Sequence, residues 1–264
     1  MPLQLKIGIH LPSLGQSLRR ALTFAAKAGA RGVVLAAQGD LRPGSLSQTG
    51  IRSLRKLLED LRLKVVAVEF NTRRGYADLD NLEPRVDATR QVMDFAFAMR
   101  TPLVLNHIGQ IPSSEESTEW STLVEVLSDL GIYAQRAGAW LTANAASCPP
   151  DDFSRLWQAL PEGSLLIDLD PALAVMNGHP PLDYIGRFGN QIAHVHARDA
   201  TRDARSLRGV ETTLGRGEVD FPVLLAALEE VGYQGYLTLE RGFSNDPAFE
   251  IERGAMYLRQ LIAE

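Results

Sequence analysis

Short apolar runs alternate along the chain with longer stretches in which apolar residues recur at helical spacing. The runs are rich in Val, Ile, Leu and Ala, and several are nearly continuous, which is typical of parallel strands buried on both faces. They predict eight strands, which are Leu5–Leu11, Gly32–Ala37, Lys64–Phe70, Pro102–Ile108, Ala139–Ala145, Ser164–Asp170, Ile192–Arg198 and Tyr236–Arg241.

The longer stretches predict amphipathic helices between these strands. In Ser17–Ala28, for example, Leu18, Leu22 and Ala25 fall on one helical face. Glycines such as Gly138 stand where a helix should stop and the next strand begin. The predicted helices are Ser17–Ala28, Leu46–Leu61, Glu83–Met99, Ser117–Arg136, Asp151–Leu160, Leu182–Phe188, Pro222–Val231 and Pro247–Ile262.

Eight strands that are each followed by a helix predict a single closed (β/α)₈ barrel over residues 1–264. No linker rich in Pro, Gly or Ser interrupts the alternation, so we expect no second domain. A doubly wound sheet would usually carry a glycine-rich phosphate turn after its first strand. The turn at residues 10–15 reads HLPSLG and lacks that pattern, which favours the barrel.

Composition narrows the functional class. The 264 residues carry a net charge of −5 with 45% hydrophobic and 22% charged residues, the balance of a soluble globular protein. No basic stripe, long apolar span or secretory leader is apparent, so we expect no nucleic-acid or membrane partner and a cytoplasmic location. One Cys excludes a disulfide framework. None of the four lysines lies toward the end of a predicted strand, which argues against a Schiff-base aldolase.

Polar residues gather where the predicted strands end, and chemistry in a (β/α)₈ barrel belongs at that end. Inward-facing side chains from different strands converge there, and carboxylates without a cation would raise one another's pKa. A divalent metal ion would remove that cost. The strand-end residues are His10, Glu69, Asn106, His107, Asn144, Asp168, Asp170, His194, His196 and Glu240.

Alternation along a strand separates neighbouring candidates. Asp168 and Asp170 share a face, and so do His194 and His196. The later member of each pair is expected nearer the mouth, so Asp170 and His196 are the stronger metal-ligand candidates. Asp168 and His194 are expected one layer lower, in a structural role.

Four motifs in order carry a family likeness. They are DPALAVMNG at 170–178, IAHVHARD at 192–199, GRGEVDF at 215–221 and GYLTLE at 235–240. Together they resemble the xylose-isomerase-like barrel superfamily, the sugar phosphate isomerase/epimerase group. The endonuclease branch of that group fits poorly, because Leu173 stands where its additional His is required.

The resemblance implies one divalent metal ion, such as Mn²⁺, Mg²⁺, Co²⁺ or Zn²⁺. The family's Asp, His and Glu ligands on the last three strands correspond to Asp170, His196 and Glu240. The fifth-strand ligand, usually Glu, corresponds here to Asn144. The neutral amide predicts a weakly bound metal.

The resemblance also implies an isomerase or epimerase that acts on a small sugar, polyol or hydroxy-keto acid through an enediolate. Glu240 is the candidate base, and Glu69 and His107 are candidates for the second proton transfer. Two alternatives stay open: a dehydratase of the same superfamily, and a barrel that binds a sugar-like ligand without turnover. A homo-oligomer also stays open. Candidate substrate-binding residues are His10, Asn106, Arg216, Arg202 and Trp120.

Overall fold

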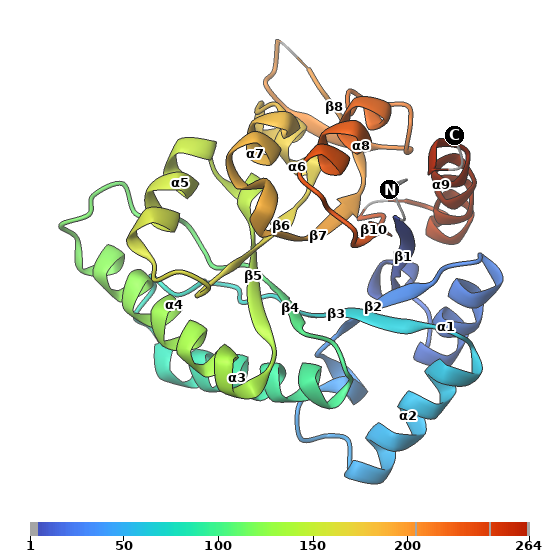
Figure 1. The fold of residues 1–264 in the computed structure, drawn as a ribbon, viewed down its shortest axis with the longest axis horizontal. Coiled ribbons are helices and arrows are strands. Elements are labelled where there is room, and N and C mark those ends of the chain that lie inside the picture. Colours follow the sequence, from blue (N-terminus) through green and yellow to red (C-terminus); the bar gives the residue numbers. More distant parts are fainter. Residues whose placement is uncertain (1–4, 204, 243, 263–264) are drawn as a thin grey trace.

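The computed structural model describes residues 5–203, 205–242 and 244–262. Eight parallel strands close into a barrel in the order β1-β10-β7-β6-β5-β4-β3-β2, which confirms the predicted fold class (Figure 1). The barrel strands are β1 (Lys6–His10), β2 (Gly32–Ala36), β3 (Lys64–Phe70), β4 (Leu103–Asn106), β5 (Trp140–Asn144), β6 (Leu166–Leu169), β7 (Ile192–Ala197) and β10 (Tyr236–Leu239).

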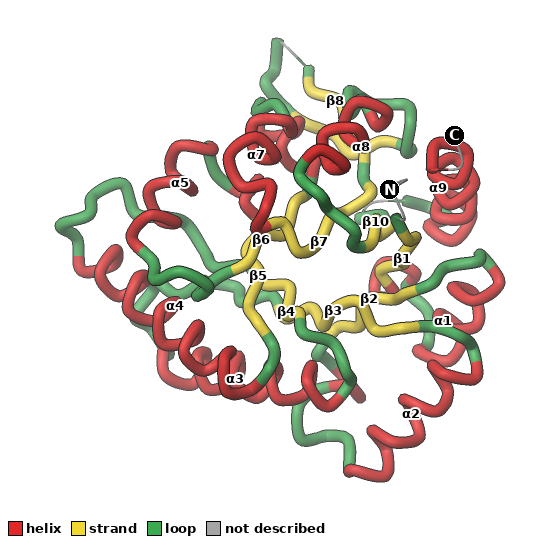
Figure 2. The backbone as a smooth tube through the Cα atoms, in the orientation of Figure 1, coloured by secondary structure: helices red, strands yellow, loops and turns green. Residues whose placement is uncertain are grey.

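Helices form an outer ring around the strands, as Figure 2 shows. None of the helices in the described part of the chain is long and apolar enough to cross a membrane. The helices are α1 (Leu18–Lys27), α2 (Gln48–Asp60), α3 (Leu82–Ala98), α4 (Thr118–Ala137), α5 (Pro150–Ala159), α6 (Pro171–Asn177), α7 (Pro181–Phe188), α8 (Phe221–Glu230) and α9 (Pro247–Ile262).

Local sequence sets where several helices begin and end. The Ser117 side chain accepts a hydrogen bond from the Trp120 N–H at 3.1 Å, which caps α4. Asp220 accepts from the Val223 N–H at the start of α8 in the same way. Helix α4 ends at Gly138, whose φ of 73° is the left-handed conformation that glycine adopts without strain.

The barrel interior is packed with side chains. A Cβ atom added at Gly32 would lie 2.4 Å from Val66 Cγ2 and 2.6 Å from Tyr236 Cε1. Side chains from β3 and β10 therefore meet over the backbone of β2. This packing leaves the carboxyl ends of the strands as the accessible part of the barrel.

One short helix and a two-stranded hairpin were not predicted. Helix α6 starts directly after β6 and is too short for a hydrophobic periodicity to be recognised. Strands β8 (Asp199–Arg202) and β9 (Gly209–Thr212) form an antiparallel hairpin after β7. A Cβ at Gly209 would lie 2.3 Å from the Met176 Cα, so the hairpin packs directly on α6.

Candidate active site

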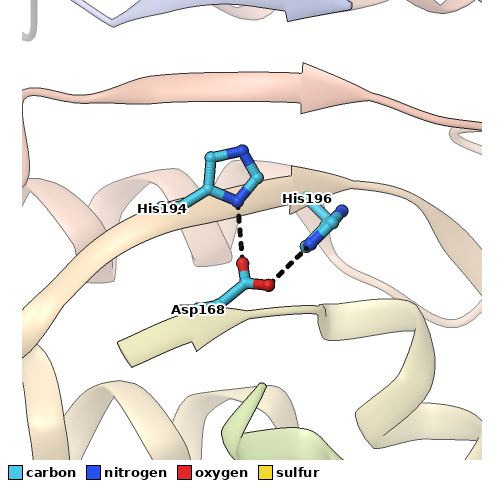
Figure 3. Close-up of side chains that lie close together, drawn as sticks. All are labelled: Asp168, His194 and His196. Atoms are coloured by element: carbon cyan, nitrogen blue, oxygen red, sulfur yellow. Dashed lines mark hydrogen bonds and ion pairs between the residues drawn. The ribbon is translucent and has the colours of Figure 1, made fainter. Parts of the chain in front are cut away.

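A buried carboxylate joins β6 to β7. Asp168 on β6 lies 2.7 Å from His194 Nδ1 through one oxygen and 2.9 Å from His196 Nε2 through the other. Figure 3 shows its carboxylate pointing toward both rings. Asp168 is only 3% exposed. Burial by itself would raise its pKa, but the two imidazoles outweigh it and hold the pKa below the usual range.

His194 is held on both sides. Its Nε2 atom lies 2.8 Å from the hydroxyl of Thr238 on β10. Burial lowers the pKa of His194, which favours the neutral ring. A neutral His194 donates from Nδ1 to Asp168 and accepts at Nε2 from Thr238. The ring is therefore fixed in one orientation between three strands.

His196 connects two carboxylates. Its Nε2 contacts Asp168, and its Nδ1 lies 2.8 Å from Glu240 Oε2, just after β10. Burial opposes the charged ring, but Asp168 and Glu240 outweigh burial and raise the pKa of His196 well above its ordinary value. At neutral pH His196 is an imidazolium that hydrogen-bonds Asp168 through Nε2 and forms an ion pair with Glu240 on its Nδ1 side.

Arg198 lies between Glu240 and a further carboxylate, that of Asp170. Its Nη1 is 2.5 Å from Asp170 Oδ2 and 4.0 Å from Glu240 Oε1. The other oxygen of Asp170 accepts the Leu173 N–H at 3.0 Å and caps α6. Both oxygens of Asp170 are thus already engaged.

The hairpin supplies a third carboxylate to this network. Glu211 on β9 lies 3.3 Å from Arg198 Nε and 3.2 Å from Arg241 Nη1. Arg241 also lies 2.8 Å from Glu250 at the start of α9. Arg198 is therefore held by Asp170, which follows β6, and by Glu211 on β9.

Asp199 shapes the loop that follows the hairpin. One of its oxygens accepts the N–H groups of Gly215 and Gly217 at 2.9 and 2.8 Å. Its other oxygen accepts the Val219 N–H at 3.1 Å. A Cβ at Gly217 would lie 2.1 Å from this carboxylate, so the Gly-Arg-Gly motif lets the loop close onto Asp199.

His10 and Glu69 form a second acid–imidazole pair, from β1 and β3. His10 Nε2 lies 3.4 Å from Glu69 Oε2, and His10 is 5% exposed. Burial lowers the pKa of His10, but Glu240 and Glu69 together raise it above its ordinary value. Strand β1 pairs directly with β10 in the barrel, so His10 lies at the same end of neighbouring strands as Glu240.

Three other predicted residues have different local roles. Asn144 accepts the Ala146 N–H at 3.1 Å and caps the short turn after β5. Asn106 is buried and donates from Nδ2 to the Phe70 carbonyl at 2.5 Å. His107 has an exposed side chain, which lines a separate cleft of about 830 Å³ between the loops after β3 and β4.

The remaining substrate-binding candidates are dispersed. Trp120 is buried in α4. The Arg155 guanidinium carbon lies over the Trp120 ring, 4.4 Å from the ring centre. Arg202 ends β8 and packs against Gly178 after α6. Arg216 is exposed in the loop that Asp199 organises. No contact in the described part of the chain joins these three to His196 or Glu240.

Two groups of residues are candidates for a metal site. Ligand atoms of Asp168, His194 and His196 all lie within 4.8 Å of one another, so this triad could bind a divalent metal ion. In the group predicted from the sequence, Asn144 and Asp170 cap helical turns and Arg198 holds Asp170. That ligand set stays a prediction, with His196 common to both groups.

Sequence reasoning did not single out all of these residues. Asp168 and His194 were predicted to lie one layer below the mouth in a structural role, and Asp168 contacts His196 directly. Arg198 could have been recognised, because it shares the inward face of His194 and His196 by alternation. Glu211 gave no signal, since its position depends on the unpredicted hairpin.

A closed parallel barrel with carboxylates, imidazoles and a guanidinium at the carboxyl ends of its strands has the arrangement of a barrel enzyme. The family profile described as "Xylose isomerase-like TIM barrel" matches residues 22–261. The chain therefore belongs to that family.

Several characterised proteins and solved structures resemble the chain. Inosose dehydratase from Clostridium perfringens is 28% identical over 167 residues, 57% of this chain and 54% of that protein, so this match spans about half of the relative. Fructoselysine 3-epimerase from Escherichia coli O157:H7 is 23% identical over 85% of this chain and 84% of the relative. A xylose isomerase domain protein from Planctomyces limnophilus superimposes with a TM-score of 0.86 at 23% identity, covering 98% and 97% of the two chains, and supports the fold alone.

Proposed function

We propose that the protein catalyses proton transfer at a carbon next to a carbonyl group, as an isomerase or epimerase of a small sugar, polyol or hydroxy-keto acid. The observation that carries the proposal is the position of Glu240. Its carboxylate follows β10 at the mouth and is 16% exposed, with His196 on one side and Arg198 on the other.

Each group has a part in the proposed step. Burial opposes ionisation of Glu240, but His10, His196 and Arg198 hold its pKa low, so it is ionised at neutral pH, the form that a base requires. The same low pKa makes it a weak base, so proton transfer to Glu240 depends on stabilisation of the enediolate that forms. The positive charges of His196 and Arg198 lie beside Glu240 and would stabilise the negative charge of an enediolate oxygen bound next to them. The His10–Glu69 pair is the candidate for returning the proton, with His107 as the more distant alternative.

A divalent ion, when bound, would polarise the substrate carbonyl. Asp168, His194 and His196 could hold it, or Asp170, His196, Glu240 and Asn144 as the family resemblance implies. An imidazolium has a proton on both ring nitrogens, so His196 would have to lose a proton before either nitrogen could bind a metal ion.

A dehydratase is the second candidate, and its support is the similarity to inosose dehydratases. One of these, from Clostridium botulinum, is 22% identical over 97% of both chains. Loss of water next to a carbonyl begins with the same proton removal, so Glu240 would have the same part. Binding without turnover is the outcome if Asn144, in place of a second carboxylate, prevents the return of the proton.

The test is a panel of ketoses, inososes and hydroxy-keto acids incubated with the protein, with and without added Mn²⁺. Product analysis by NMR separates the candidates: an epimer or aldose supports the first, and an unsaturated or deoxy product supports the dehydratase. Ligand binding without any product across the panel would reject both catalytic proposals.

A further inference from the structure

We propose that Arg198 is the resident cation of the barrel mouth, and that its guanidinium competes with divalent metal ions for the carboxylates of Asp170 and Glu240. The proposal concerns the same site as the proposed function. It is tested through metal affinity in the absence of substrate, so its outcome is separate from whether turnover is found.

The geometry of one atom carries the proposal. Arg198 Nη1 lies 2.5 Å from Asp170 Oδ2 and 4.0 Å from Glu240 Oε1. The second oxygen of Glu240 is 2.8 Å from His196 Nδ1. The family resemblance identifies Asp170, His196 and Glu240 as metal ligands. Asp170 and Glu240 form ion pairs with this guanidinium, and His196 pairs with Glu240.

Burial makes this cation necessary. The side chains of Asp170 and Glu240 are 2% and 16% exposed, and that of Arg198 is 14% exposed. Buried carboxylates are unfavourable without a compensating charge, and a guanidinium stays protonated at any working pH. A divalent ion entering between Asp170 and Glu240 would meet this fixed positive charge at close range and be repelled.

Arg198 is also anchored against moving aside. Its Nε lies 3.3 Å from Glu211, whose carboxylate in turn accepts the Gly242 N–H at 3.0 Å and contacts Arg241 at 3.2 Å. A metal ion that takes both carboxylates must therefore break the Asp170 contact and either displace Arg198 from Glu211 or move the hairpin.

The experiment is calorimetric titration of Mn²⁺ into the wild-type protein and Arg198→Gln. Removing the guanidinium is expected to tighten Mn²⁺ binding by about tenfold or more. Arg198→Lys keeps the positive charge and should stay within about threefold of the wild type. Arg241→Gln is the matched control, because Arg241 is a buried arginine that forms ion pairs with the same Glu211 and with Glu250. It should also stay within about threefold.

A double variant shows whether the additional Mn²⁺ affinity of Arg198→Gln depends on Asp170. Adding Asp170→Asn to Arg198→Gln should abolish the gain in affinity. Equal Mn²⁺ affinity in the wild type and Arg198→Gln would overturn the proposal, and so would a gain that survives Asp170→Asn.

Wild-type crystals soaked in millimolar Mn²⁺ provide a measurement that does not depend on any variant folding. The proposal expects Arg198 on Asp170 and no anomalous manganese peak between Asp170 and Glu240. A peak there while Arg198 keeps its contacts would overturn it.

Discussion

At the scale of residues, the site is a set of buried charges that are balanced in pairs. Asp168 has no solvent to stabilise its charge and depends on His194 and His196 for both oxygens. Breaking a buried pair by neutralising one partner leaves the other charge uncompensated. Neutralising Asp168 would leave the buried imidazolium of His196 without one of its two carboxylate partners, which is strongly unfavourable.

Asp168→Asn should therefore lower the free energy of unfolding by about 3 kcal/mol or more at pH 7, measured by urea denaturation. The matched control is Asp151→Asn. Asp151 pairs with Arg187 on the surface, with a side chain 88% exposed, and its loss should cost under about 1 kcal/mol. Equal effects of the two substitutions would contradict the balance of charges inferred for the site.

The cost of Asp168→Asn should also depend on pH. The pKa of Asp168 is lower in the folded protein than in the unfolded chain, so its stabilisation is present above the unfolded pKa, about 3.9. That stabilisation is lost as the pH falls through the folded pKa. The stability difference between wild type and variant should shrink progressively below about pH 4.

At the scale of elements, alternation along strands predicted which side chains face the mouth. His194, His196 and Arg198 share one face of β7 and its continuation, and the structure brings His196 to Glu240. The hairpin β8–β9 could not be predicted, because its four-residue strands are polar and partly exposed. The positions of Asp170 and Asn144 as caps depend on short helical turns, for which one sequence carries little periodic signal.

Two helix glycines offer a test of packing at this scale. Gly131 in α4 faces Ser164, whose Cα would lie 2.5 Å from an added Cβ, whereas nothing lies within 4 Å of a Cβ at Gly186 in α7. Gly131→Ala should destabilise the fold by about 1–3 kcal/mol through overpacking. Gly186→Ala should stabilise it by about 0.5–1 kcal/mol through helix propensity. Thermal unfolding measures both, and a neutral or stabilising effect of Gly131→Ala would show that α4 does not pack against Ser164 as described.

At the scale of the whole molecule, closure of the barrel is what assembles the site. β1 and β3 bring His10 and Glu69, while β6, β7 and β10 bring Asp168, His196 and Glu240 to the same end. The residues lie far apart in sequence, and only the parallel order of the closed sheet makes them neighbours. Because the barrel was predictable from the alternation, so was the meeting of strand ends, although not the pairing of each carboxylate.

In the proposed reaction Glu240 removes a proton from the carbon next to a carbonyl group. The direct measurement is deuterium incorporation from D₂O at that carbon, followed by NMR on the best substrate of the panel. Wild-type protein should exchange the proton, and Glu240→Gln should slow the exchange by about 100- to 10,000-fold. Glu59→Gln, which alters an exposed ion pair on α2, should leave the rate unchanged. Exchange at the wild-type rate in Glu240→Gln would contradict the account.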